Sequence, residues 1–105
     1  MDKKPSHFLR IMEKYPRYMK AHEELGKAVK EAGPLDEKTL NLVQLAAAAA
    51  AGSEGAVHSH ARRARNLGVT EAELCHAILA CTSTVGFPAV SAALSWIGHP
   101  DEEED

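Results

Sequence analysis

Residues 52–68, GSEGAVHSHARRARNLG, hold two histidines, His58 and His60, followed closely by three arginines. An imidazole exchanges protons near neutral pH, and a guanidinium binds a carboxylate through two parallel hydrogen bonds. These residue types suit acid–base chemistry on a small carboxylated molecule. On a helix the two histidines lie about 200° apart, so they cannot share one metal ion or one proton. The spacing therefore predicts no metal site.

The two histidines face different surroundings if this stretch is helical. The residues on the His58 face are charged, namely Glu54, Arg62 and Arg65. Those on the His60 face are small or apolar apart from one serine, namely Ser53, Ala56, Ala64 and Leu67. We therefore expect His58 to be exposed and His60 to face either a subunit interface or a pocket between three helices, those expected at residues 36–51, 53–67 and 70–85.

His60 is the better candidate for a catalytic residue, and a core histidine held by one hydrogen bond is the alternative. An unpaired polar group in a core costs roughly 1–3 kcal/mol, so a buried imidazole needs a partner. We expect this partner to be Asn41 or Gln44 on the preceding helix, a water molecule or a bound ligand.

Capping and stop signals place these residues in an all-α, single-domain protein of about six helices. Pro16 suits the first turn of a helix, Asp36 and Ser53 suit N-cap positions, and residues 70–73 fit a capping box. The expected helices cover residues 5–14, 16–32, 36–51, 53–67, 70–85 and 89–97. The chain then has three parts, which are N-terminal helices (1–34), a core (35–98) and an acidic, disordered tail (99–105).

The composition excludes several classes of protein. Aromatic residues make up only 5%, and alanine and leucine fill the apolar positions, which favours helices over a sandwich or barrel. The formal charge of −3 becomes +2 without the five acids of residues 101–105, too weak a basic bias for nucleic acid. The longest apolar run, LAAAAAA, is too short to span a bilayer. We expect neither nucleic acid nor membrane as a partner.

Cys75 and Cys81 are the two cysteines of the chain. We expect both on one helix, about 9 Å apart along its axis, which excludes a disulfide between them. The N-terminus has no apolar segment typical of a signal peptide. These features predict a reduced, cytoplasmic protein.

Three segments resemble the carboxymuconolactone decarboxylase family, which includes the alkylhydroperoxidase D-like proteins. The segments are LDEKTLNLVQLAAAAAAG, HARRARNLGVTEAEL and VGFPAVSAAL, within residues 35–97. The resemblance implies an orthogonal helical bundle of the alkylhydroperoxidase D-like type and assembly into a homotrimer or homohexamer. No cofactor is expected.

The chain departs from the redox branch of that family. The branch carries two cysteines three residues apart, the second four residues before the histidine, and a glutamate twelve residues before the first. Ser53, Ala56 and Asn41 stand at these positions here. Peroxide reduction needs a thiolate, a resolving thiol and a base, so thiol peroxidase activity is disfavoured. The decarboxylase branch, by resemblance, also lacks the cysteines, keeps the histidine, and acts on a carboxylated lactone.

Two hypotheses of function remain open. In the first, the chain is a decarboxylase-like acid–base catalyst, a lyase, with His60 as its catalytic residue. In the second, it is a non-catalytic oligomeric protein that binds a ligand or serves as a scaffold. The candidate substrate-binding residues are Asn41, Gln44, Ser53, Arg62 and Arg63. The expected partners are other copies of the chain and a small carboxylated ligand.

Overall fold

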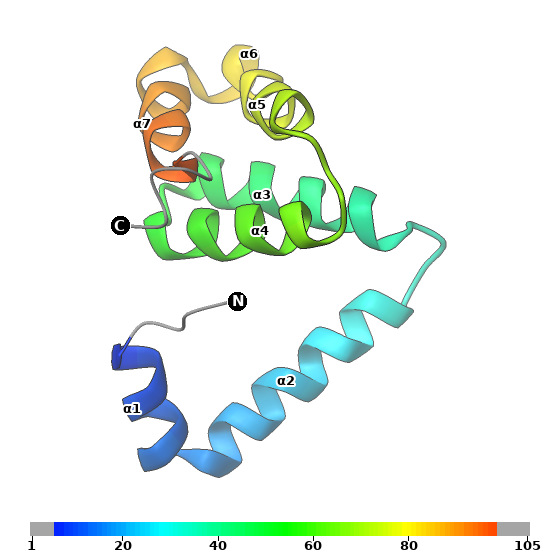
Figure 1. Ribbon diagram of the computed structural model, residues 1–105, viewed down its shortest axis with the longest axis vertical. Helices are drawn as coiled ribbons and strands as arrows, with labels where there is room; N and C mark the ends of the chain where they lie inside the picture. Colours follow the sequence, from blue (N-terminus) through cyan, green and yellow to red (C-terminus); the bar gives the residue numbers. More distant parts are fainter. Residues whose placement is uncertain (1–5, 99–105) are drawn as a thin grey trace. The chain divides into compact units, whose positions relative to one another are not determined.

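The computed structural model describes residues 6–98, and all regular elements within this range are α-helices (Figure 1). The expected all-α fold is confirmed. The helices are α1 (Ser6–Lys14), α2 (Pro16–Glu31), α3 (Glu37–Ala51), α4 (Glu54–Asn66), α5 (Glu71–Leu79), α6 (Thr82–Val85) and α7 (Phe87–Ile97). The chain divides into two compact units, one that ends at Leu35 and one that begins at Asp36.

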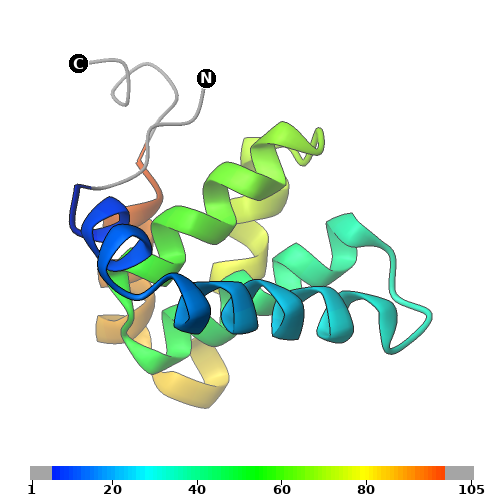
Figure 2. The same cartoon turned by 90° about the horizontal axis from the view of Figure 1, so that it is seen from below.

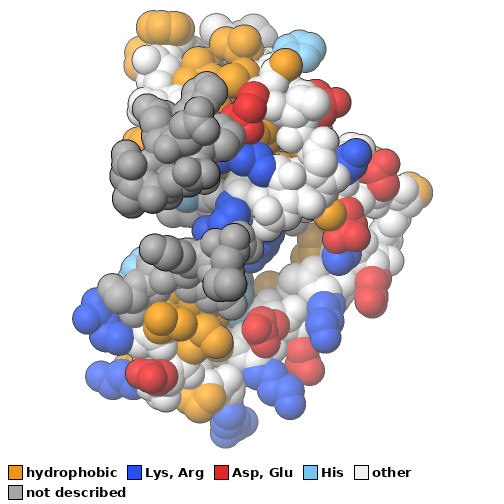
Figure 3. Space-filling model, viewed as in Figure 1, with side chains coloured by type: hydrophobic (Ala, Val, Ile, Leu, Met, Phe, Trp, Pro, Cys, Tyr) orange, Lys and Arg blue, Asp and Glu red, His pale blue; other side chains and the backbone are white. Residues whose placement is uncertain are grey.

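The N-terminal unit, formed by α1 and α2, buries few of its apolar side chains. Pro16 occupies the first turn of α2, where its missing N–H group leaves no intrahelical bond unmade. Met19 is the one buried apolar residue among those described in this unit. The large apolar residues that stay exposed here are Leu9, Tyr15, Tyr18, Leu25, Val29 and Leu35. In the space-filling view, apolar side chains are exposed among interspersed acidic and basic ones (Figure 3).

The exposed stripe of Tyr18, Leu25 and Val29 on α2 bears on self-association, which stays a prediction. Contiguous exposed apolar surface marks interaction sites in soluble proteins, and we expect other copies of the chain to cover this stripe. Light scattering at micromolar concentration should therefore give the mass of a trimer or hexamer. Leu25→Lys should shift it towards the monomer, whereas Lys20→Ala on the same helix should not. A monomeric wild-type protein would contradict this expectation.

The C-terminal unit is built around α3 and α4, which lie side by side and make the most extensive contact between any two helices (Figures 1 and 2). Helices α5 and α7 pack against this pair. The largest fully buried side chains are Leu45, Leu74, Ile78, Val57 and Val90. Alanines complete the same core, including Ala48 and Ala49 from the alanine run. A helix surface without γ carbons lets the two backbones approach closely.

Three helix N-termini form as the sequence predicts. Asp36 and Ser53 accept hydrogen bonds from backbone N–H groups in the first turns of α3 and α4, and Thr70 and Glu73 form a reciprocal capping box at α5. The backbone N–H donors lower the pKa of both the Asp36 and the Glu73 carboxyl. Gly52, with φ of +71°, ends α3 in the left-handed conformation that favours glycine.

The predicted helix of residues 70–85 is divided in the structure into α5 and the short α6. At Cys81 the backbone N–H group bonds to the carbonyl three residues back, which tightens and ends the turn. Cys75 and Cys81 therefore do not share one helix, and the prediction that they do is wrong. Both are free thiols. Helix α7 begins at Phe87 rather than at residue 89, with Pro88 in its first turn.

The remaining expectations concern the acidic tail, membrane-spanning helices and metal ligands. The predicted acidic tail, residues 99–105, lies beyond the described part of the chain. Between residues 6 and 98, no helix combines the length and the apolar character needed to cross a bilayer. In the same range, no three or more His, Cys, Asp and Glu side chains gather as metal ligands would.

Candidate functional site

His60 lies on the inward side of α4 and is half-buried, between residues that belong to the core. Ala61 and Ala64, the next residue and the residue one turn later, are fully buried. Nδ1 of His60 is buried and has no hydrogen-bond partner within the described residues. The expected bond to this atom from Asn41 or Gln44 is therefore not formed. The imidazole is left with a polar atom that water or a ligand would satisfy.

The protonation of His60 is disfavoured by its surroundings. Burial, the larger cause, and the positive charge of Arg63 together lower the pKa of the imidazole below its ordinary value. Arg63 lies three residues further along α4, so it projects near the same face. The protonated form of His60 is therefore a stronger acid than a free imidazolium ion.

His58 is exposed, as predicted. Half of its side-chain surface is accessible, and Nε2 lies 3.5 Å from a carboxylate oxygen of Glu54, one turn earlier on the helix. A pair of this kind on a helix surface contributes little to stability. The two histidines therefore differ in burial in the direction that helical periodicity predicts.

Arg65, which helical periodicity places on the same face of α4 as His58, is not exposed. Its side chain is only 13% exposed. Nε and Nη2 donate to the two carboxylate oxygens of Glu71 over 2.6 and 2.8 Å. Nη2 also donates to the backbone oxygens of Ile97 and Gly98, both at 3.0 Å. Arg65 thus links α4 to the start of α5 and the end of α7, and its role is structural.

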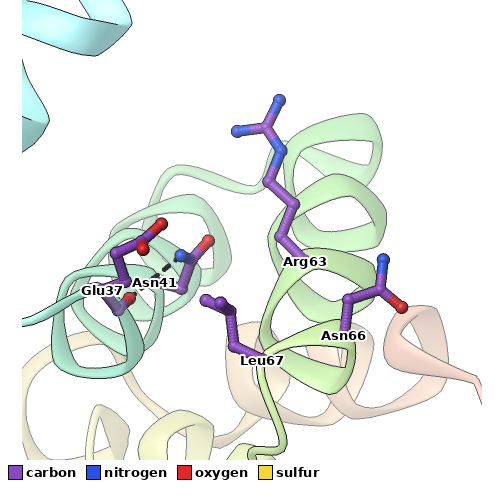
Figure 4. Close-up of a pocket in the computed structure, with 5 residues that line it drawn as sticks. All are labelled: Glu37, Asn41, Arg63, Asn66 and Leu67. Atoms are coloured by element: carbon purple, nitrogen blue, oxygen red, sulfur yellow. Dashed lines mark hydrogen bonds between the residues drawn. The ribbon is translucent and has the colours of Figure 1, made fainter.

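A cavity of about 230 Å³ lies between the first turns of α3 and the last turns of α4 (Figure 4). Its lining residues are Glu37 and Asn41 from α3, with Arg63, Asn66 and Leu67 from the end of α4. Leu67 points from α4 towards Asn41, and the long side chain of Arg63 extends outward beside them (Figure 4). One cation, one anion and two amides therefore surround a small, open space.

The cavity brings together two of the predicted substrate-binding residues, Asn41 and Arg63. The other three are not among its lining residues. Gln44 is half-buried one turn further along α3. Arg62 is half-buried on α4 and already interacts with another part of the protein. Ser53 caps α4, its hydroxyl oxygen accepting the N–H of a residue in the first turn at 3.4 Å.

Three lining residues were not predicted from the sequence. Glu37 lies four residues before Asn41, and Asn66 and Leu67 lie three and four residues after Arg63. Helical spacing places each beside a residue that was predicted, so this signal was present in the sequence. His60 lies one turn before Arg63 and is not a lining residue of this cavity, so its expected exposure to a pocket stays a prediction.

Comparison with known proteins is consistent with this fold. The model of the carboxymuconolactone decarboxylase family matches residues 16–98. The crystal structure of a carboxymuconolactone decarboxylase family protein from Legionella pneumophila superposes with a TM-score of 0.76. The two chains are 24% identical, and the similarity covers 88% of this chain and 85% of the other. A search of curated proteins found no match.

Proposed function

We propose that this chain, which belongs to the carboxymuconolactone decarboxylase family, is an acid–base catalyst that decarboxylates a small molecule by means of His60. The observation that supports this function is the half-buried imidazole, whose buried Nδ1 has no partner within the described residues. An imidazole held in this way has a nitrogen whose hydrogen-bonding capacity the fold leaves unused. A core histidine of purely structural use would be expected to spend that atom on a hydrogen bond.

The chemistry assigned to His60 is the delivery of one proton to carbon. In a decarboxylation the bond between carbon and carboxylate breaks, CO₂ leaves, and the electron pair stays on the substrate. A proton must then replace the lost carboxylate. Imidazolium, reprotonated from solvent after each turnover, is a suitable donor, and a pKa lowered by burial and by Arg63 makes it a stronger one.

The neighbouring residues would hold the substrate. Arg63 offers a guanidinium on the wall of the cavity next to His60, and this group pairs with a substrate carboxylate through two hydrogen bonds. Asn41 lies across the same cavity. The remaining candidates, Gln44, Ser53 and Arg62, would act at most around the His60 side chain rather than in this cavity.

Thiol peroxidase activity has less support. Ser53 is engaged as a helix cap, and Ala56 has no reactive group. Of the two cysteines, Cys81 lies with its sulfur 3.6 and 3.8 Å from the carbonyl oxygens of Ala77 and Ala46. This places its thiol against backbone acceptors.

The function is tested by incubating the protein with carboxylated lactones and measuring CO₂ release as a function of pH. Because the proton donor is the charged imidazole and its pKa is lowered, the rate should rise as the pH falls from 8 through the ordinary histidine value of about 6.5. It should level off only below the lowered pKa of His60. Circular dichroism at each pH separates this effect from unfolding. Binding without CO₂ release would favour the non-catalytic hypothesis, and a rate that rises with pH would contradict the assigned role.

A further inference from the structure

The cavity between α3 and α4 lies at the ends of the two helices that are remote from their connection at Gly52. Near that connection the buried residues are Ala48 and Ala49 of α3 and Val57 of α4. At the opposite end, Asn41 of α3 and Leu67 after α4 are among the residues that line the cavity (Figure 4). A volume of about 230 Å³ falls below the range of roughly 300–1,000 Å³ typical of sites for drug-sized ligands. Its occupant would be smaller than a drug-sized molecule, although a cavity of about 150 Å³ is already large enough for benzene.

Asn41 supplies a fixed acceptor in this cavity. Its Nδ2 donates to the backbone oxygen of Glu37 at 3.0 Å, which sets the orientation of the amide (Figure 4). Turning the amide over would place two carbonyl oxygens against each other, so the orientation is determined by this bond. The other end of the amide, Oδ1, is buried and accepts no hydrogen bond from the described residues. A ligand that satisfies Oδ1 must carry an O–H or N–H donor.

Arg63 supplies the complementary charge. It is exposed on the wall of the cavity, and no carboxylate within residues 6–98 forms an ion pair with it. A guanidinium in this position pairs best with a carboxylate, through two parallel hydrogen bonds. Arg63 is the one cation among the described residues that line the cavity, which matches a ligand with a single carboxylate.

We propose that this cavity binds a small monocarboxylate that carries a hydroxyl or ammonium group, with its carboxylate on Arg63 and its donor on Asn41 Oδ1. A simple acid without the donor would leave Oδ1 unsatisfied, and the second carboxylate of a diacid would find no second cation among the described lining residues. This site rests on the proposed function only for its substrate, which would be a lactone with one carboxylate and a hydroxyl group, whereas binding itself does not depend on catalysis. The site therefore selects hydroxy acids and amino acids over plain acids of the same size.

The test is a titration of the ¹⁵N-labelled protein with glycolate, acetate and glycolamide, followed by NMR at the Asn41 side-chain amide and the Arg63 Nε–H group. Glycolate should bind about fivefold more tightly than acetate, the value of one ordinary hydrogen bond. In Asn41→Ala this difference should disappear. Arg63→Gln should weaken glycolate by about tenfold and leave glycolamide nearly unchanged. Lys38→Gln removes the same charge from a residue that does not line the cavity, and should have little effect.

The outcomes separate this site from the proposed catalysis. Glycolate that binds no more tightly than acetate, or no change at Asn41 and Arg63 even at about 0.1 M glycolate, would overturn the site. Because Arg63 is exposed, Arg63→Gln should fold even if Asn41→Ala does not. The effect of Arg63→Gln on glycolate binding then decides on its own whether the carboxylate lies at Arg63. Selective glycolate binding without any CO₂ release would sustain the site and refute the decarboxylase. CO₂ release without selective glycolate binding would sustain the decarboxylase and refute the site.

Discussion

Arg65→Ala is expected to lower the free energy of unfolding by about 3 kcal/mol, the low end of the cost of removing one partner from a buried ion pair. The guanidinium donates to both carboxylate oxygens of Glu71 and to the carbonyl oxygens of Ile97 and Gly98. Replacement by alanine removes all of these donors, which connect α4 to the start of α5 and the end of α7. We expect the low end because the Glu71 side chain is 36% exposed, and water replaces part of what is lost.

Urea unfolding followed by circular dichroism measures this loss. Arg63→Ala on the same helix is the matched control, because Arg63 is exposed and its replacement should change stability by less than about 0.5 kcal/mol. Arg65→Lys should fall between the two, since an ammonium keeps the charge and loses the two-pronged geometry. Equal losses in Arg65→Ala and Arg63→Ala would show that the contacts of Arg65 contribute little.

His60→Gln is expected to reduce the turnover of a carboxylated lactone by about 10²- to 10⁴-fold, the usual contribution of a positioned acid or base. Glutamine approximates the size and polarity of histidine but has no group that titrates near neutral pH. The melting temperature should change little, because Nδ1 of His60 makes no hydrogen bond to the described residues that the substitution would remove. Steady-state kinetics of CO₂ release and a thermal melt measure the two effects.

His58→Gln provides the control for this experiment. His58 lies on the same helix, is exposed, and carries only a surface pair with Glu54. Its substitution should leave both turnover and melting temperature near the wild-type values. If His60→Gln lowers the melting temperature while turnover per folded molecule persists, His60 is a structural residue and the proposed function fails.

Much of the fold could be predicted from local sequence signals, because these signals act over a few residues. The caps at Asp36, Ser53 and Thr70 depend on side chains that reach backbone groups within the next turn. The break between α5 and α6 could not be predicted in this way. No glycine or proline marks it, and the helical pattern continues through Cys81. The tightened turn at Cys81 is determined by the tertiary structure rather than by local sequence signals.

The site was predictable to the extent that it follows helical periodicity. The different burial of His58 and His60 follows from their positions around one helix, and the structure shows it. Arg65 has the same angular position as His58, and the same argument gave the wrong result. Its partners include backbone atoms of Ile97 and Gly98, more than thirty residues later, whose location no local pattern contains. For the same reason, the cavity that joins Asn41 to Arg63 emerges only once α3 and α4 are packed.

The alanines of the core have a consequence for conformational entropy. Of the thirteen apolar residues that are buried between residues 6 and 98, five are alanines, namely Ala48, Ala49, Ala61, Ala64 and Ala93. A buried leucine or isoleucine loses roughly 0.5–1 kcal/mol of rotamer entropy on folding, and alanine loses none. Burial of these five alanines therefore removes little apolar surface from water, but it also costs no side-chain rotamer entropy. Because alanine has no alternative rotamers, Ala61 and Ala64 also hold the backbone beside His60 through contacts that cannot rearrange by side-chain rotation.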